Sequence, residues 1–80
     1  MQTIGARLKH ARLRKVWTQE DLAQESGLPV VTISRIENGH SRNTRQSTVR
    51  KLAGALGVEP AWLMFGGETQ GETQAEKLAA

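Results

Sequence analysis

The chain has 80 residues, a net charge of +3 and an apolar fraction of 38%, with one Phe, two Trp and no Tyr. A chain of this length makes one small domain, and its core must be mainly aliphatic. The absence of cysteine excludes disulfides and cysteine-based metal sites, and neither a leader nor a run of the roughly 20 apolar residues that span a membrane is found, so a cytoplasmic location is expected.

The first predicted helix spans about residues 3–16. Thr3 can cap it, and apolar residues recur at helical spacing to give one stripe: Ile4, Leu8 and Ala11. Arg12 lies beside this stripe, so we expect it to have a partner, because burying an unpaired charge is costly. Trp17 is expected to fill the space between the first two helices. The other basic residues are expected on a solvated face: Arg7, Lys9, Arg14 and Lys15.

The second predicted helix is short and is followed by a tight hinge. Thr18 and Asp21 have the spacing of a weak capping box, and the helix is expected to end near Glu25. Gly27 can adopt the left-handed conformation that the hinge requires. The inner face of this helix carries Leu22 and Ala23.

The third predicted helix has an unusual outer surface. Pro29 suits its first turn, and Asn38-Gly39 ends it after Glu37. Its inner face carries Ile33 and Ile36, and its outer face carries Val30, Val31, Thr32, Ser34 and Arg35. This surface is apolar at one end and basic at the other. It suits a helix in the major groove of DNA, where thymine methyls and guanine edges are the available partners.

Two more helices complete the predicted fold. The fourth covers about residues 45–56 and ends at Gly57, with four apolar residues facing inward: Val49, Leu52, Ala53 and Leu56. Pro60 begins a short fifth helix over residues 61–65. Because no strand-like alternation occurs, we predict an all-α domain of five helices over residues 1–65.

The segment 66–80 is expected to be a disordered tail. Gly-Glu-Thr-Gln occurs twice, at 67–70 and 71–74, and the segment has too few apolar residues to build a core. Residues 77–80 resemble a cloning-vector linker, so we exclude them from the reasoning on fold and function.

Charge is unevenly distributed along the chain. Residues 1–51 hold ten Lys or Arg and four acids, a net +6, whereas residues 52–80 hold one Lys and four acids, a net −3. A basic half favours a polyanionic partner such as nucleic acid, although solvated basic helices are also common in small proteins.

Residues 4–65 resemble the phage repressor and Cro type of helix-turn-helix domain, the XRE family. The resemblance implies a compact five-helix fold like that of lambda repressor, with the helix-turn-helix in the second and third helices. The matching motifs are Ile4-Gly5-x-x-Leu8, Arg12, Thr18-Gln19-Glu20-x-Leu22-Ala23, Gly27, Thr32-Ile33-Ser34-Arg35-Ile36-Glu37-Asn38-Gly39, Leu52-Ala53-x-Ala55-Leu56-Gly57-Val58 and Trp62-Leu63.

The resemblance also implies roles for individual residues. Base edges would be contacted by Val30, Val31, Thr32 and Arg35, with Ser34 near them. DNA phosphates would be contacted by Thr18, Gln19, Asn38, Arg42 and Arg45. Gln19 would also brace the recognition helix, and Arg12 and Glu37 would form an internal salt bridge. Val30 and Val31 stand where this family often has polar residues. The alternative to base contact is that one of them helps to bury the turn. Arg35 is alternatively a phosphate contact.

The fifth helix carries more apolar side chains than one short helix is expected to hide. We therefore predict a symmetric homodimer through Leu63, Met64 and Phe65, which pairs only modestly in free solution. The alternative is that these residues close the core of a single copy.

The expected function is sequence-specific binding of double-stranded DNA by a dimeric transcription regulator, more often a repressor, at a palindromic operator. One alternative is a regulator of its own two-gene module, as an antitoxin that binds a toxin protein or a restriction–modification controller. Another is a protein-binding adaptor of the same fold. We expect no enzyme activity, cofactor or metal, because the two histidines, His10 and His40, accompany no suitable nucleophile or carboxylate pair.

Overall fold

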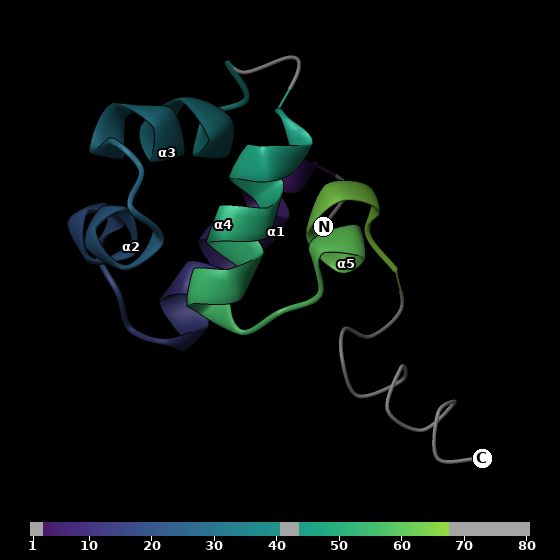
Figure 1. The fold of residues 1–80 in the computed structure, drawn as a ribbon, viewed down its shortest axis with the longest axis horizontal. Coiled ribbons are helices and arrows are strands. Elements are labelled where there is room, and N and C mark those ends of the chain that lie inside the picture. Colours follow the sequence, from purple (N-terminus) through teal and green to yellow (C-terminus); the bar gives the residue numbers. More distant parts are fainter. Residues whose placement is uncertain (1–2, 41–43, 68–80) are drawn as a thin grey trace.

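The computed structural model describes residues 3–40 and 44–67, and within these ranges it contains five helices and no strand (Figure 1). The all-α prediction is therefore confirmed. The helices are α1 (Ile4–Arg14), α2 (Gln19–Ser26), α3 (Val30–Glu37), α4 (Gln46–Leu56) and α5 (Pro60–Phe65). None of the described helices is long and apolar enough to cross a membrane. The predicted phosphate contact Arg42 and the tail from residue 68 onward lie outside the described residues.

The helices contact one another in a closed ring around one core. α2 packs against α3 and α4, α5 packs against α4 and α1, and α1 packs against α3. In Figure 1, α2 and α3 lie at one side of the domain and α5 at the other. This arrangement leaves the outer side of α3 uncovered by the other described helices.

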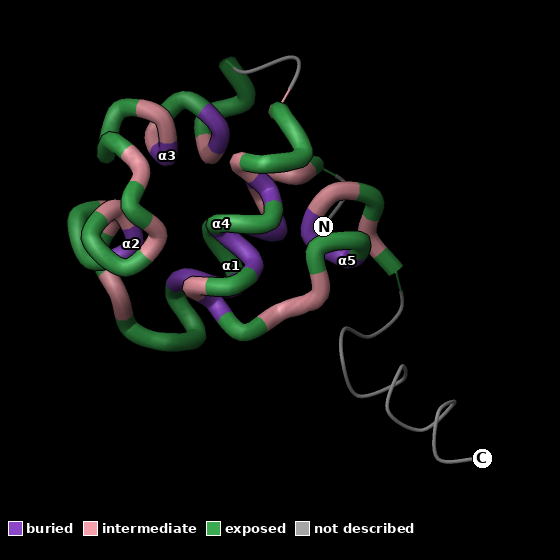
Figure 2. The backbone as a smooth tube through the Cα atoms, viewed as in Figure 1, coloured by how far each residue is buried: buried purple, intermediate pink, exposed green. Residues whose placement is uncertain are grey.

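Each helix contributes at least one aliphatic side chain with no exposed surface to the core, namely Leu8, Leu22, Ile33, Leu52 and Leu63. Figure 2 shows a buried stretch on each of the five helices. The placement of Leu63 corrects the prediction that it lies in a dimer interface. Its side chain has no exposed surface, because α5 uses it to close the core against α1 and α4.

α1 ends two residues before its predicted end. The Val16 N–H donates to the Leu13 carbonyl at 2.9 Å, and the Trp17 N–H donates to the Arg12 carbonyl at 3.2 Å. This pair of bonds forms a Schellman motif, whose left-handed position is usually a glycine. Here that position is Val16, with φ of +58° and a side chain that is 88% exposed. A β-branched residue is strained in this conformation, and burial does not offset the strain.

The strain at Val16 predicts that Val16→Gly stabilises the domain. Holding an L-residue in the left-handed conformation costs about 1–2 kcal/mol, which glycine avoids. Glycine also makes the unfolded chain more flexible, which offsets about 0.5–1 kcal/mol of this gain. We expect urea denaturation to show a free energy of unfolding that is higher by about 0.5–1 kcal/mol. A glycine variant less stable than the parent would contradict the assignment of strain to this residue.

Arg7 is buried, which corrects the prediction that it lies on a solvated face. The residue is only 4% exposed, and its guanidinium group donates from Nε to the Leu63 carbonyl at 2.9 Å and from Nη2 to the Met64 carbonyl at 2.8 Å. Burial lowers the pKa of Arg7 from its ordinary value. The guanidinium thus caps carbonyls at the end of α5 and holds this helix against α1. Arg14 is exposed, as predicted.

Candidate nucleic-acid interface

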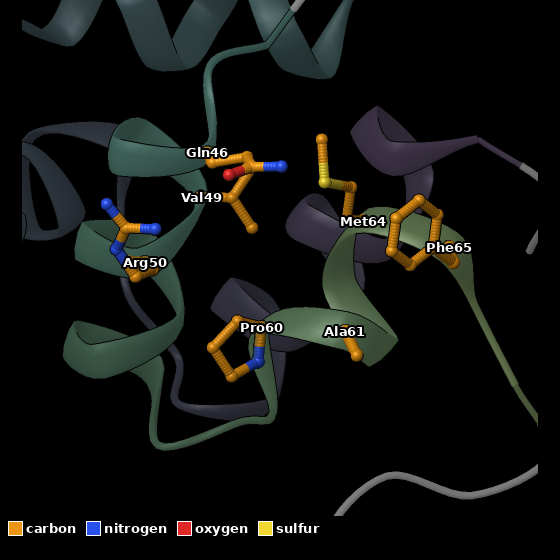
Figure 3. Close-up of a pocket in the computed structure, with 7 residues that line it drawn as sticks. All are labelled: Gln46, Val49, Arg50, Pro60, Ala61, Met64 and Phe65. Atoms are coloured by element: carbon orange, nitrogen blue, oxygen red, sulfur yellow. The ribbon is translucent and has the colours of Figure 1, made fainter.

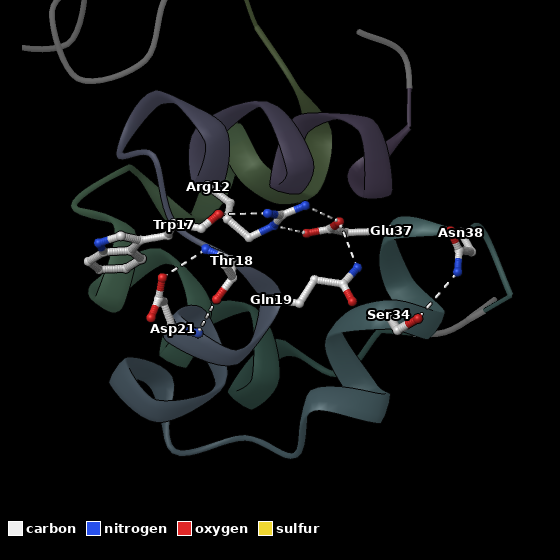
Figure 4. Close-up of polar contacts among 8 residues, drawn as sticks. All are labelled: Arg12, Trp17, Thr18, Gln19, Asp21, Ser34, Glu37 and Asn38. Carbon is white, nitrogen blue, oxygen red and sulfur yellow. Dashed lines mark hydrogen bonds and ion pairs between the residues drawn. The ribbon is translucent and has the colours of Figure 1, made fainter.

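Both ends of α2 are fixed by local hydrogen bonds and backbone conformation. Thr18 and Asp21 form a complete capping box, with the Asp21 N–H donating to Thr18 Oγ1 at 3.0 Å and the Thr18 N–H donating to Asp21 Oδ2 at 2.8 Å (Figure 4). Gly27 ends α2 in the left-handed conformation with φ of +76°. Both features were predicted. The capping box fixes the start of α2, and Gly27 turns the chain at its end, so that α3 begins only three residues after α2.

Pro29 takes a different place from the one predicted. It is the N-cap of α3, with φ of −63° and ψ of 144°, so the helical first turn begins at Val30. No side chain caps this helix start. The Thr32 N–H donates to the Pro29 carbonyl at 3.0 Å, while the N–H groups of Val30 and Val31 have no side-chain acceptor, an arrangement that favours an anion such as a phosphate.

The two faces of α3 differ as predicted. Ile33 and Ile36 are buried in the core, whereas Val30 is 41% exposed, Val31 is 52% exposed and Arg35 is exposed. The remaining two residues predicted to contact bases, Thr32 and Ser34, are half-buried. All five predicted base contacts therefore lie on one helix, and the three most accessible are the two valines and the arginine.

Glu37 is the centre of a polar cluster that fixes the end of α3. Arg12 donates to its carboxylate twice, from Nε to Oε2 at 2.8 Å and from Nη2 to Oε1 at 2.9 Å, which confirms the predicted salt bridge (Figure 4). Gln19 Nε2 donates to Oε1 of the same carboxylate at 3.1 Å, and Arg12 Nη1 donates to the Trp17 carbonyl at 2.7 Å. The cluster joins α1, the start of α2 and the end of α3.

The pKa of Arg12 is raised, mainly by the hydrogen bond to Glu37, while burial acts in the opposite direction and the charge of Glu37 adds to the rise. A bidentate arginine–carboxylate pair constrains orientation as well as distance. The angle at which α3 leaves the core is therefore set by this pair rather than by apolar packing alone.

The residues predicted to contact phosphates surround α3 at several positions. Gln19 is half-buried at the start of α2, and its amide braces Glu37 as predicted. Asn38 is exposed and donates from Nδ2 to Ser34 Oγ at 3.3 Å, and Arg45 is the exposed N-cap of α4. Thr18 is exposed, and its hydroxyl oxygen accepts the capping bond. Contact with phosphate stays a prediction for all of these residues.

The predicted dimer surface is divided by the fold. Met64 is half-buried and Phe65 is 77% exposed, while Leu63 lies in the core. Figure 3 shows Met64 and Phe65 beside a groove of about 250 Å³ between α4 and α5. The groove is lined by Gln46, Val49, Arg50, Pro60, Ala61, Met64 and Phe65.

Gly5 is a structural determinant of the interface to which the sequence alone assigned no role. A Cβ at this position would overlap the Ile36 carbonyl oxygen and lie 3.0 Å from the Glu37 carbonyl oxygen. Glycine thus lets α1 approach the last turn of α3 closely. The sequence does show a glycine beside the apolar stripe of α1, which is compatible with a close helix contact. It does not show which helix makes that contact.

Comparison with known proteins identifies similar domains. A family profile described as helix-turn-helix matches residues 8–63. The HTH-type transcriptional regulator PrtR of Pseudomonas aeruginosa is 38% identical over 64 residues, which cover 80% of this chain and 24% of PrtR. The chain spans between 24% and 48% of the length of three curated relatives that it matches.

Two solved structures extend the likeness to three dimensions. The P22 c2 repressor in complex with synthetic operator 9T matches with a TM-score of 0.75 and 25% identity, over 84% of this chain and 100% of that chain. The restriction-modification controller protein C.AhdI from Aeromonas hydrophila matches with a TM-score of 0.71 and 39% identity, over 76% of this chain and 91% of that chain.

Proposed function

Because the chain belongs to the helix-turn-helix family, whose profile covers most of it, we propose that it is a transcription regulator that binds double-stranded DNA sequence-specifically. One observation carries the proposal. The Arg12–Glu37–Gln19 cluster and the buried Ile33 and Ile36 hold α3 rigidly, while its opposite face stays exposed. A helix held in this way can enter the major groove with its N-terminal residues on base edges.

Arg35 supplies the hydrogen-bonding part of the proposed recognition. Its side chain is exposed on α3, one helical turn after Val31. A guanidinium group there can donate two hydrogen bonds to guanine O6 and N7, which discriminates against other bases by roughly 1–3 kcal/mol. Thr18, Gln19, Asn38, Arg42 and Arg45 would position the helix through phosphates without adding sequence information.

Substitution of Arg35 tests this role. On duplexes recovered by selection from random DNA, we expect Arg35→Ala to lower affinity by about 5–150-fold, which corresponds to 1–3 kcal/mol. Arg35→Lys keeps the charge but loses the bidentate geometry, so it should retain binding to random DNA and lose most of the preference for the selected site. Fluorescence anisotropy on both duplexes measures the ratio. If Arg35→Ala weakened both duplexes equally, base contact by Arg35 would be refuted.

We further propose that two copies pair through Phe65, Met64 and the α4–α5 groove. Phe65 is one of the large apolar side chains that are exposed in the described part of the chain, and it lies beside an apolar groove. A two-fold interface is self-complementary, so the same patch on each copy would cover the other. Such a dimer would present two α3 helices to half-sites about one turn of DNA apart.

The dimer proposal predicts that Phe65→Glu gives a monomer. Placing two carboxylates at a self-complementary apolar contact disfavours pairing through repulsion and desolvation. Sedimentation equilibrium should show a lower average mass than the parent at equal concentration, while Leu13→Glu, a matched change at an exposed residue of α1, should leave the mass unchanged. Equal masses for Phe65→Glu and a dimeric parent would place the interface elsewhere, and a parent that stays monomeric both alone and on DNA would refute the dimer.

The proposed regulator acts by occupancy: the dimer covers a palindromic operator that overlaps a promoter and excludes polymerase. The likeness to C.AhdI favours a second candidate, a controller of a restriction–modification locus. Location of the selected operator upstream of such a locus would support the second candidate over a repressor of other genes.

A further inference from the structure

Val30 and Val31 form a small apolar patch at the start of α3 whose exposure has no explanation within the fold. They are 41% and 52% exposed, while the core is filled from α3 by Ile33 and Ile36. They also do little to stabilise the helix itself, because β-branched residues are poor helix formers. Neither valine caps the helix start, which has no side-chain cap. The patch therefore contributes neither to the core nor to the local stability of α3.

The position of the patch indicates what covers it. Val31 and Arg35 are four residues apart, as are Val30 and Ser34, so the valines continue along the same exposed surface as the arginine. If α3 enters the major groove, as the proposed function requires, residues at its N-terminus face base edges. A valine side chain has no donor or acceptor. The apolar group that a base edge presents in that groove is the C5 methyl of thymine.

We propose that the Val30–Val31 patch recognises pyrimidine C5 methyl groups as such, rather than the base that carries them. The methyl projects from C5 in both thymine and 5-methylcytosine, and these bases differ beside it, with an O4 acceptor in one and an N4 amino donor in the other. Valine cannot distinguish acceptor from donor by hydrogen bonding. A methylated cytosine at a contacted position is therefore expected to replace thymine, which makes binding to such a site sensitive to cytosine methylation.

The size of the effect follows from burial of a single methyl group. Removing one contacted methyl should weaken binding about fourfold, and a symmetric site changed in both halves should lose about 16-fold. Replacing thymine by uracil removes only the methyl group and leaves every hydrogen-bonding group of the duplex in place. A contact between Arg35 and guanine would therefore be unaffected by this replacement.

The experiment uses duplexes recovered by selection from random DNA. Each thymine is replaced in turn by deoxyuridine, and each position that responds is then tested as a C·G pair with cytosine or 5-methylcytosine. Affinities are measured for the parent, for Val30→Ala/Val31→Ala and for Val31→Thr, which keeps the shape of valine but exposes a hydroxyl. Circular dichroism confirms that each variant is helical, as expected for changes at exposed positions.

We expect deoxyuridine to weaken parent binding about fourfold per half-site at one or two positions, and 5-methylcytosine there to bind about fourfold better than cytosine. The double alanine variant should lose both differences, and Val31→Thr should reduce them. Parent binding that changes less than twofold at every thymine, or a double variant that keeps the parent's dependence, would overturn the inference. If an Arg35-dependent sequence preference persisted in that case, the proposed function would stand. If no duplex were preferred over random DNA, the proposed function would fail together with the inference.

Discussion

Gly5→Ala should lower the free energy of unfolding by about 3 kcal/mol, because the new methyl group has no space between α1 and α3. Its Cβ would overlap the backbone carbonyl oxygen of Ile36, and a carbonyl in the last turn of a helix cannot move aside as a flexible side chain can. The two helices must separate, which also displaces Glu37 from the Arg12 guanidinium. For a chain of 80 residues, this loss is a large fraction of the total stability.

Gly54→Ala is the matched control for the same chemical change. Gly54 lies inside α4, is exposed, and has nothing within 4 Å of the position where a Cβ would lie. Alanine should therefore raise the free energy of unfolding by about 0.5–1 kcal/mol through better helix propensity. Urea denaturation of both variants gives the comparison. A Gly5→Ala variant as stable as the parent would show that α1 and α3 do not approach as closely as described.

Glu37→Gln should lower the free energy of unfolding by about 3–5 kcal/mol, the usual cost of removing one partner from a buried ion pair. The Glu37 side chain is 2% exposed and accepts from Arg12 and Gln19, so the variant leaves the Arg12 guanidinium without its counter-charge. We expect operator binding to weaken as well, because the bidentate pair sets the orientation of α3.

The double variant Arg12→Met/Glu37→Leu separates the cost of an unpaired charge from the worth of the pair. Apolar residues of similar volume often replace a buried pair with little loss, so the double variant should be more stable than Glu37→Gln alone. Its α3 would be held less specifically, and its preference for the selected site should fall even where its stability recovers. The expected loss in the free energy of unfolding is at least about 3 kcal/mol. A Glu37→Gln variant whose free energy of unfolding lies within about 1 kcal/mol of the parent's would therefore refute a structural role for the cluster.

Several helix ends of this domain could be predicted from the sequence, because they depend on neighbours in the chain. The Thr18–Asp21 capping box and the left-handed Gly27 and Gly57 lie where the sequence placed them. Val16 was not predicted, because valine is uncommon in the left-handed conformation, and the Schellman motif that imposes it on Val16 is visible only in three dimensions.

The remaining differences arise from contacts between helices that are distant in sequence. Arg7 lies three residues after Ile4 and four before Ala11, so helical periodicity already places it on the apolar stripe, but its acceptors are carbonyls of α5. In α5, Leu63, Met64 and Phe65 are all apolar, and their order in the chain does not show which one faces the core. The position of α5 on α1 and α4 decides that Leu63 is buried and Phe65 is exposed.

The part of the candidate site that lies on α3 could be predicted from the sequence. The spacing of Ile33 and Ile36 shows which face of α3 is buried, and therefore which face is exposed. The bracing by Gln19 and the pairing of Arg12 with Glu37 followed from the family resemblance, and the structure contains both. The close approach at Gly5 could not be predicted, because it depends on the packing of α1 against α3.

Selection of bound sequences from a random pool of duplex DNA tests the central claim most directly. A dimer that presents two α3 helices should enrich a two-fold symmetric motif whose half-sites lie about 10 base pairs apart, centre to centre. Each half-site should contain a guanine that depends on Arg35. A pool that remains as diverse after repeated rounds as at the start would contradict sequence-specific recognition by this chain.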